Sequence, residues 1–228
     1  MILKKWDEMP ANLKNEEVKK YYDIIIEKKI SLIIKRVFDI LVSLLLLIIL
    51  LPVFIILSIV IKIDSKGPVF FRQERVTEYG RVFKIFKFRT MVSGADKIGS
   101  QVTVKDDCRI TRSGKLLRKI RIDEIPQLIN ILIGDMSFVG TRPEVLKYVE
   151  LYTNEMKATL LMKAGVTSLA SIKFKDEEKL LQSSDDVDKS YIENVLPKKM
   201  EYNLEYIKKF NFFYDIKLMF MTVKAVIK

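Results

Sequence analysis

The most apolar part of the chain runs from Ile40 to Ile61 and contains no charged side chain. Its regularity is interrupted only by Ser43, Pro52 and Ser58. A run longer than the ~18 residues of a membrane helix is expensive to keep in a domain surrounded by water. The pattern therefore predicts that this segment inserts into a membrane.

Pro52 divides the apolar run into two arms, and neither arm alone is long enough to cross a bilayer. At ~1.5 Å per residue the arms reach ~18 and ~14 Å, against a hydrocarbon core of ~30 Å. Basic residues flank both ends in similar numbers, so the charge pattern places both ends in the cytoplasm. A helix that enters, breaks at Pro52 and returns satisfies both ends and is slightly favoured, while a proline-kinked spanning helix stays open. The flanking residues are Lys19, Lys20, Lys28, Lys29, Lys35 and Arg36 upstream, and Lys62, Lys66, Arg72, Arg75 and Arg81 downstream.

Two further segments have apolar positions at helical spacing beside lysines. Residues 11–30 carry one stripe, which predicts a short helix packed on a core, with a membrane surface as the alternative. Residues 212–226 carry another, which predicts a basic helix that either rests on anionic headgroups or packs against the main domain. The stripes consist of Val18, Tyr21, Tyr22, Ile25 and Ile26, and of Phe212, Ile216, Met219, Phe220, Val223 and Val226.

Between the first and last of these segments, the sequence predicts a pair of short strands or extended segments. Val69–Val76 and Arg81–Phe88 are rich in aromatic and β-branched residues, and Gly80 suits the turn between them. The second run alternates aromatic and basic side chains, which is typical of a strand with one buried face and one basic face. The same alternation occurs in nucleic-acid-binding proteins, but no recognisable binding module accompanies it. We therefore expect a hairpin and no nucleic-acid partner.

The net charge and the residue types present limit the partners that the chain can bind and the reactions that it can catalyse. The formal net charge of +11 favours a negatively charged partner, such as a phosphorylated substrate, an anionic membrane face or nucleic acid. The chain has no histidine, which excludes sites built on imidazole, and its single cysteine, Cys108, excludes disulfides within the chain. Any reaction must use carboxylates, hydroxyls and amines, and a metal would be a hard ion such as Mg²⁺.

Two adjacent carboxylates, Asp123 and Glu124, follow a basic run that begins at Arg118. Pro126 lacks an N–H and is tolerated only in the first turn of a helix, so the carboxylates lie at or just before a helix N-terminus. Such an end attracts phosphate through its free N–H groups. Neighbouring side chains also point in different directions, so one carboxylate can attack a substrate while the other holds a metal. The alternative is that both are ordinary partners of the helix dipole.

A glycine-rich stretch from Gly134 to Glu144 contains a second candidate group, Arg142. Its glycines would let the backbone approach a ligand, and a fixed guanidinium beside them would form an oxyanion clamp. Gly-x-Arg-Pro is also ordinary turn chemistry. This stretch alone leaves both interpretations open.

Seven short motifs follow one another across residues 35–145. They read Lys35-Arg36-Val37-Phe38-Asp39, Gly67-Pro68-Val69-Phe70-Phe71-Arg72-Gln73-Glu74-Arg75, Phe83-Lys84-Ile85-Phe86-Lys87-Phe88-Arg89-Thr90-Met91, Asp107-Cys108-Arg109-Ile110-Thr111, Leu117-Arg118, Asp123-Glu124-Ile125-Pro126-Gln127-Leu128 and Gly134-Asp135-Met136-Ser137-Phe138-Val139-Gly140-Thr141-Arg142-Pro143. Each is weak alone, but the order is specific. In this order they resemble the monotopic phosphoglycosyl transferases, the bacterial sugar transferase family.

The resemblance implies a membrane enzyme at the cytoplasmic face of the bacterial plasma membrane, acting at the first membrane step of a surface glycan pathway. Such enzymes move a sugar-1-phosphate from a UDP-sugar to a polyprenol (undecaprenyl) phosphate, with Mg²⁺ and through a phosphosugar attached to an aspartate. By position, Asp123 would be the nucleophile and Glu124 the metal ligand. Arg118, Arg142 and Arg89 would lie near the substrate phosphates. A carboxylate nucleophile is ionised at neutral pH and needs no general base, which suits a chain without histidine.

The chain departs from the family pattern at several positions. Leu51 precedes Pro52 where the family favours a serine, and Arg121 replaces a small polar residue and is a candidate phosphate contact. Residues 164–171 differ from the family's Pro-Gly-Ile-Thr-Gly-Leu-Ala-Gln, so no nucleotide or sugar contact is carried over there. Asp188 resembles a downstream family aspartate and is a further candidate.

The fold class expected from these observations is α+β but mainly helical. It combines a re-entrant membrane helix with a small cytosolic catalytic domain that contains short strands and amphipathic interfacial helices. The expected partners are a UDP-sugar donor, a polyprenol phosphate acceptor and membrane lipids, with room for a homodimer. A membrane-anchored basic scaffold without catalysis is the alternative function. The predicted segments are 1–34 (amphipathic), 35–63 (re-entrant helix), 64–148 (catalytic core) and 149–228 (helical and membrane-associated).

Overall fold

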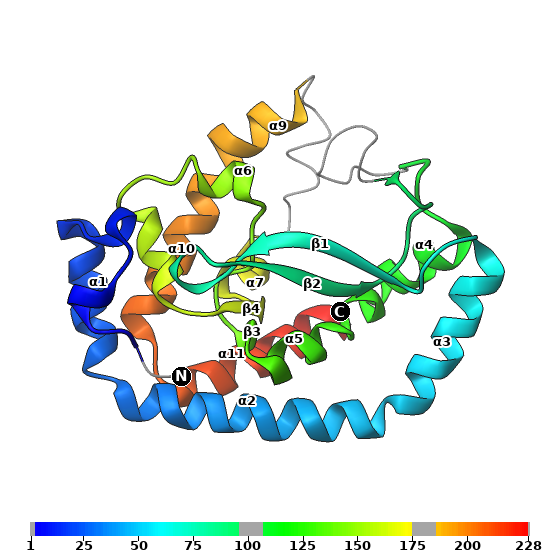
Figure 1. Ribbon diagram of the computed structural model, residues 1–228, viewed down its shortest axis with the longest axis horizontal. Coiled ribbons are helices and arrows are strands. Elements are labelled where there is room, and N and C mark those ends of the chain that lie inside the picture. The colour runs from blue at the N-terminus through cyan, green and yellow to red at the C-terminus, as the bar shows by residue number, and fades with distance from the viewer. Residues whose placement is uncertain (1–2, 96–106, 175–185, 228) are drawn as a thin grey trace.

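The computed structural model describes residues 3–95, 107–174 and 186–227. Most of these residues lie in helices, which surround a long twisted hairpin (Figure 1). The expectation of a mainly helical α+β fold is therefore confirmed.

Short elements alternate with turns along the chain. The helices are α1 (Glu16–Ile26), α2 (Lys29–Ile49), α3 (Leu51–Asp64), α4 (Arg112–Lys119), α5 (Gln127–Ile133), α6 (Leu146–Val149), α7 (Leu169–Lys173), α9 (Val187–Ser190), α10 (Leu196–Lys209) and α11 (Phe212–Ile227). The strands are β1 (Phe70–Val76), β2 (Val82–Phe88), β3 (Met136–Val139) and β4 (Ala164–Thr167). Turns of 3₁₀ helix cover Trp6–Glu8, Ala11–Leu13, Glu78–Gly80, Ile122–Glu124 and Met156–Leu161, and Tyr191–Val195 form a π-helical turn.

The predicted membrane segment forms two consecutive helices, α2 and α3, which are bent by 61° relative to each other. Within the described residues, neither helix alone has the length and hydropathy to cross a membrane, but the bent pair together does. The bend lies at Leu50, two residues before the predicted break at Pro52. Proline is accepted in the first turn of a helix because its missing N–H has no intrahelical partner there. Pro52 therefore begins α3 instead of interrupting it.

The first motif of the sequence fastens α2 to the rest of the protein. Lys35 donates to the carbonyl of Val139 (2.7 Å) and forms a buried ion pair with Asp215 of α11 (2.5 Å). Arg36 donates to two carbonyls near the end of α5, at 2.6 and 2.9 Å. Asp39 is buried and accepts a backbone N–H of β3 at 3.2 Å. The motif thus links α2 to α5, β3 and α11.

The predicted hairpin is present and ends within one residue of the predicted limits. β1 and β2 are antiparallel, with Phe70 opposite Phe88 and Val76 opposite Val82. Gly80 has a φ of 78° in the turn, a conformation that glycine adopts without strain. The buried residues of β2 face α3, α4 and α5 through two apolar clusters. The hairpin thereby carries its basic residues past the turn that precedes α5.

β3 and β4 form a second, parallel pair that the sequence pattern did not reveal. Beyond β3, Gly140 lies against Gly165 so closely that a side chain on Gly165 would meet the backbone N of Gly140 at 2.1 Å. Gly134 ends α5 with a φ of 94°. These glycines therefore serve the folding of the backbone, and the segment after β3 is held tightly against β4.

The two amphipathic segments have different surroundings. α1 buries Val18, Tyr21, Tyr22 and Ile25 against the main core, so the expectation that it packs on a core is confirmed. α11 buries Leu218 against the core, which agrees with the predicted packing against the main domain, and leaves Phe213 and other apolar residues exposed. Its predicted contact with anionic headgroups stays a prediction.

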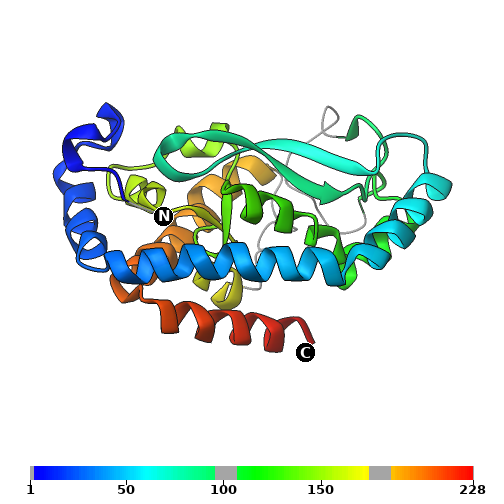
Figure 2. The ribbon, with the colours of Figure 1, turned by 60° about the horizontal axis from the view of Figure 1, so that its bottom comes forward.

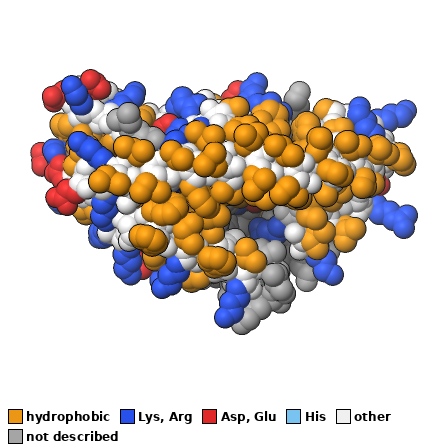
Figure 3. Space-filling model, turned by 90° about the horizontal axis from the view of Figure 1, so that it is seen from below, with side chains coloured by type: hydrophobic (Ala, Val, Ile, Leu, Met, Phe, Trp, Pro, Cys, Tyr) orange, Lys and Arg blue, Asp and Glu red, His pale blue; other side chains and the backbone are white. Residues whose placement is uncertain are grey.

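Exposed hydrophobic side chains gather on one side of the molecule, which we call the apolar face (Figure 3). In the ribbon, α2 extends along this side with α11 beside it (Figure 2). Such a large exposed patch is unusual for a protein that is surrounded by water on all sides. Its members are Ile30, Ile33, Ile34, Val37, Ile40, Leu41, Leu44, Leu45, Ile48 and Ile49 of α2, Leu51, Ile55, Ile56, Ile59, Val60 and Ile63 of α3, and Phe213, Phe220 and Val223 of α11.

Candidate active site

The two adjacent carboxylates lie in a short turn between α4 and α5. Ile122–Glu124 form a turn of 3₁₀ helix, and Pro126 directly precedes the first residue of α5. The position predicted from Pro126, at or just before a helix N-terminus, is therefore confirmed. The turn brings Asp123 and Glu124 toward β2 and toward the segment that follows β3.

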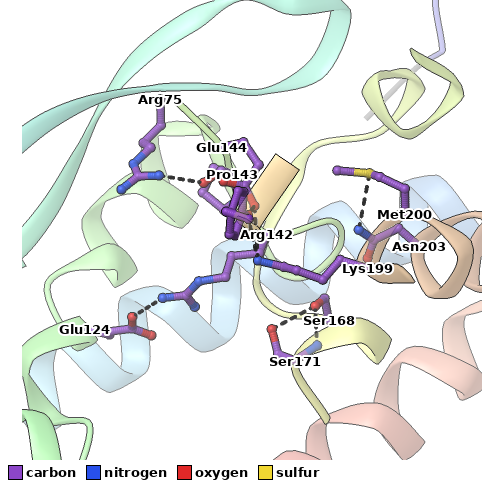
Figure 4. A network of polar contacts seen from close by, with 11 residues as sticks. Arg75, Glu124, Arg142, Pro143, Glu144, Ser168, Ser171, Lys199, Met200 and Asn203 are labelled. Atoms are coloured by element: carbon purple, nitrogen blue, oxygen red, sulfur yellow. Dashed lines mark hydrogen bonds and ion pairs between the residues drawn. The ribbon is translucent and has the colours of Figure 1, made fainter. Parts of the chain in front are cut away.

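Glu124 binds two cations that come from distant parts of the chain. Its Oε1 accepts from Lys87 of β2 at 2.8 Å and from Arg142 at 2.6 Å (Figure 4 shows the contact with Arg142). The Glu124 side chain is only 12% exposed. Burial alone raises the pKa of this carboxyl, but Arg142 and Lys87 more than offset it and hold the pKa well below its usual range. Glu124 is therefore ionised at neutral pH.

For the carboxyl group of Asp123, the effect of burial on the pKa outweighs that of the nearby cations. Burial raises its pKa and the charge of Glu124 adds to the shift, whereas Lys87, Arg118 and Arg142 oppose it. Two neighbouring carboxyl groups whose pKa values are pushed apart are typical of sites in which each carboxyl has its own role. Burial thus disfavours the charged form of Asp123, whereas Lys87 and Arg142 stabilise the charged form of Glu124.

Lys87 was not singled out by the sequence analysis, although it lies within one of the quoted motifs. Burial lowers the pKa of Lys87, and the attraction of Glu124 and Asp123 only partly restores it. Its neighbour on the same strand, Lys84, is exposed. Because side chains alternate along a strand, Lys84 and Lys87 lie on opposite faces of β2, and Lys87 shares the face of the buried Phe83 and Ile85. The alternation therefore separates the two lysines, but only the folded structure shows that the partner of Lys87 is Glu124.

The other candidate residues lie at different positions relative to the two carboxylates. Arg118, on α4, is close enough to Asp123 to lower its pKa. Arg121 is exposed and has a φ of 56°, a left-handed conformation that is uncommon for a residue with a side chain. Asp188, on α9, pairs with Lys147 (2.5 Å) and accepts from the Tyr148 hydroxyl (2.8 Å). The structure thus gathers Arg118 and Arg142 around the carboxylates and gives Asp188 partners on α6.

Arg89 makes its hydrogen bonds at the end of α3. Its Nη2 donates to the carbonyl of Ser65 (2.6 Å), to the Ser65 hydroxyl (3.0 Å) and to the carbonyl of Ile61 (3.3 Å). Carbonyls at a helix C-terminus lack intrahelical partners, and basic side chains commonly satisfy them. Arg89 is 4% exposed, and its hydrogen bonds connect β2 with α3 instead of reaching the two carboxylates. Its predicted contact with substrate phosphate stays a prediction.

The carboxylates can also be tested as ligands of a metal ion. The described part of the chain contains no cluster of three or more acidic or cysteine side chains arranged around one point. Mg²⁺ usually keeps several waters and binds through one or two carboxylates together with substrate phosphates. Glu124 with Asp123 beside it fits that donor set when a diphosphate supplies further oxygens.

Comparison with known proteins shows what the whole chain is similar to. The bacterial sugar transferase family matches residues 30–228 of the chain. The UDP-N-acetylgalactosamine-undecaprenyl-phosphate N-acetylgalactosaminephosphotransferase of Aeromonas hydrophila is 34% identical over 173 residues, which cover 75% of this chain and 38% of that protein. The UDP-glucose:undecaprenyl-phosphate glucose-1-phosphate transferase of Klebsiella pneumoniae is 38% identical over 220 residues, which cover 94% of this chain and 41% of that protein.

A relative of more similar length is also found. The uncharacterized sugar transferase EpsL of Bacillus subtilis (strain 168) is 34% identical over 168 residues, which cover 74% of each chain. The chain thus spans about two fifths of the two longer relatives and most of the shorter one. The family match includes all the residues placed in the site above. The chain therefore belongs to the bacterial sugar transferase family.

Proposed function

We propose that the protein transfers a sugar-1-phosphate from a UDP-sugar to undecaprenyl phosphate at the cytoplasmic face of the bacterial plasma membrane. The observation that carries the proposal is the pair Asp123 and Glu124, with Lys87, Arg118 and Arg142 around it. Three cations facing two carboxylates leave positive charge for a diphosphate. The names of the longer relatives, which pair a UDP-sugar with undecaprenyl phosphate, support the choice of donor and acceptor.

In the first step an oxygen of Asp123 attacks the phosphorus that is bonded to the sugar. The new bond joins the carboxylate to phosphorus, and the bond to the bridging oxygen of the diphosphate breaks. UMP leaves with that electron pair. Arg118 and Arg142 neutralise charge on the phosphates during the transfer, and Lys87 with Arg142 holds Glu124 ionised and in place.

In the second step a phosphate oxygen of undecaprenyl phosphate attacks the same phosphorus. The bond to Asp123 breaks, and the carboxylate is restored as the lipid-linked sugar diphosphate leaves. Mg²⁺, when bound, would be held by Glu124 and would neutralise negative charge on the donor diphosphate. Neither step needs a general base, because both attacking oxygens are already ionised.

The membrane part of the proposal rests on the apolar face and the bent helix pair. A lipid acceptor presents its phosphate at the membrane surface, so the site must be held at that surface. The 61° bend between α2 and α3 suits a helix that enters the membrane and returns to the same side. With such a re-entrant helix, the basic flanks of both arms stay in the cytoplasm.

The experiment that tests the function is release of UMP by the full chain in vesicles that contain undecaprenyl phosphate, with Mg²⁺ and a panel of UDP-sugars. Asp123→Asn keeps the size of the side chain but removes its charge, and we expect it to abolish release. Asp23→Asn, an exposed aspartate of α1, is the matched control and retains activity. Full activity of Asp123→Asn would refute the proposed nucleophile. A protein that binds vesicles but no donor would be a scaffold.

A further inference from the structure

The segment of residues 140–144, which we call the arginine loop, is fixed at every residue around Arg142. The N–H of Gly140 and the carbonyl of Thr141 are hydrogen-bonded to the backbone of β4, at 3.0 and 2.9 Å. The carbonyls of Pro143 and Glu144 accept from residues of β1, at 3.4 Å from a guanidinium and 2.9 Å from a backbone N–H. Arg142 projects from between these fixed points toward Glu124 (Figure 4).

The side chain of Glu144 provides the last and most buried of these attachments. Its Oε1 accepts from the Tyr191 hydroxyl at 2.6 Å and from Lys199 at 3.2 Å, and Lys199 also donates to that hydroxyl at 2.9 Å. All three residues, which we call the Glu144 cluster, are at most 6% exposed. Burial raises the pKa of Glu144, but Lys199, Arg75 and the Tyr191 hydroxyl bring it below its usual value, so it is ionised.

The Glu144 cluster belongs to a distinctive part of the backbone. Tyr191 opens the π-helical turn between α9 and α10, and such turns are rare and frequently found at functional sites. Its ring packs against that of Tyr148 with centroids 4.7 Å apart, and the Tyr148 hydroxyl donates to Asp188. Asp188, a candidate from the sequence, is therefore connected to the arginine loop through two tyrosines.

A buried ion pair adds little stability compared with apolar residues of the same size, so stability is a poor reason for this cluster. Its position gives another reason. Glu144 is two residues from Arg142, and only a proline with a fixed φ lies between them. A displacement of about 1 Å at a reacting centre can cost about 100-fold in rate, so the loop must be held precisely.

We propose that Glu144, held by Tyr191 and Lys199, is a positioning residue that fixes Arg142 on Glu124. The helices α9 and α10 thereby set the geometry of a site whose reacting groups lie on other elements. The importance of this geometry for transfer rests on the proposed function, whereas the restraint on Arg142 does not.

The restraint is tested with phenylglyoxal, which modifies arginine side chains, and with mass spectrometry of the full chain to follow the rate at Arg142. Tyr191→Phe removes one hydroxyl from the cluster and keeps the ring against Tyr148. Glu144→Gln removes the charge. Tyr22→Phe is the matched control, because that buried hydroxyl donates to a carbonyl of the N-terminal segment at 3.1 Å. Arg112, which is exposed on α4, is the internal reference.

We expect Arg142 to react about fivefold faster in Tyr191→Phe, which corresponds to the loss of one ordinary hydrogen bond. The rate at Arg112 stays constant, and Tyr22→Phe changes neither rate. An unchanged rate at Arg142 in both cluster variants would overturn the proposal. An equal rise at Arg112 would also overturn it, because it would indicate general loosening. If Glu144→Gln does not fold, Tyr191→Phe decides the question.

The consequence for catalysis is tested by a double-mutant cycle in the UMP-release assay. If Glu144 acts through Arg142, Tyr191→Phe lowers the rate in the natural protein and has little effect once Arg142→Met is present. Equal losses in both backgrounds would contradict a positioning role. If the natural protein releases no UMP with any donor, the proposed function fails, and the labelling experiment still decides the restraint on Arg142.

Discussion

Asp123 and Glu124 are neighbours in the chain, yet their surroundings give them different properties. Two cations contact one oxygen of Glu124, whereas Asp123 owes its raised pKa mainly to burial. This difference suits the proposed mechanism, in which Glu124 remains a fixed anion while Asp123 forms and breaks a bond. The same comparison shows that Lys87, like Arg142, acts on both carboxyl groups.

Lys87 is therefore the first residue to change. Lys87→Met removes one of the two cations on Glu124 and charge near the donor phosphates, and we expect UMP release to fall about 100-fold, as for other electrostatic groups of active sites. Lys84→Met, on the same strand and exposed, should leave the rate unchanged. Equal effects of the two substitutions would show that Lys87 contributes only to the overall positive charge.

The pH dependence of the first step reports on Asp123. The reaction needs the carboxylate, so the rate falls as the pH drops through the pKa of Asp123, which burial places above the ordinary 3.8. Arg118 lowers that pKa, so Arg118→Gln should move this acidic fall in rate, the acid limb of the pH–rate profile, to higher pH. Arg112→Gln, an exposed arginine of the same helix, should leave the limb in place. A limb that moves to lower pH in Arg118→Gln would contradict the assignment.

At this scale, the sequence predicts the parts of the site that depend on local structure. Pro126 alone is enough to place Asp123 and Glu124 at the start of a helix. Lys87 and Glu144 could not be found in this way, because their partners lie far along the chain and only the folded structure brings them together. Arg89 is a different case. The motif that contains it predicts a contact with substrate phosphate, whereas its hydrogen bonds in the folded protein are made with the end of α3.

Among the elements, the bent pair α2 and α3 has the clearest consequence. We expect the protein to float with vesicles of anionic phospholipid, with the apolar face in contact with the acyl chains. Leu45→Lys places a charge on an exposed position of α2, which costs about 2.5–3.5 kcal/mol at the centre of a membrane, and should reduce the bound fraction strongly. The result is measured by flotation, with circular dichroism to confirm the fold.

Leu151→Lys provides the matched control, because Leu151 is similarly exposed (50% against 55% for Leu45) but follows α6, which lies across the molecule from α2 (Figure 1). It should leave flotation unchanged. If both substitutions reduced binding equally, or if neither did, the apolar face would not be the surface that contacts the membrane.

The elements also differ in how well their patterns predict them. The hairpin was predicted within one residue because alternating aromatics and Gly80 are local signals. β3 and β4 were missed because a four-residue strand buried in a parallel pair shows no alternation, and their contact depends on Gly140 meeting Gly165. The sequence predicts a break at Pro52, whereas the bend lies at Leu50. A proline indicates that a helix boundary is near, but it does not show on which side of the proline the first helix ends.

On the scale of the whole molecule, distant segments share the task of building the site. α2 carries the apolar face and also holds β3 through Lys35, while β3 leads directly into the arginine loop. α9 and α10 approach the same loop from the other side through the Glu144 cluster. The apolar face and the candidate site are thus linked through one continuous set of contacts.

The central claim is that Asp123 carries the sugar-phosphate between the two substrates. The most direct measurement is mass spectrometry of the purified full chain after brief incubation with Mg²⁺ and individual UDP-sugars, without undecaprenyl phosphate. We predict an adduct of one sugar-phosphate on the peptide that contains Asp123, absent in Asp123→Asn and lost when the acceptor is added. Complete transfer to undecaprenyl phosphate without such an adduct, or with an adduct on another residue, would contradict it.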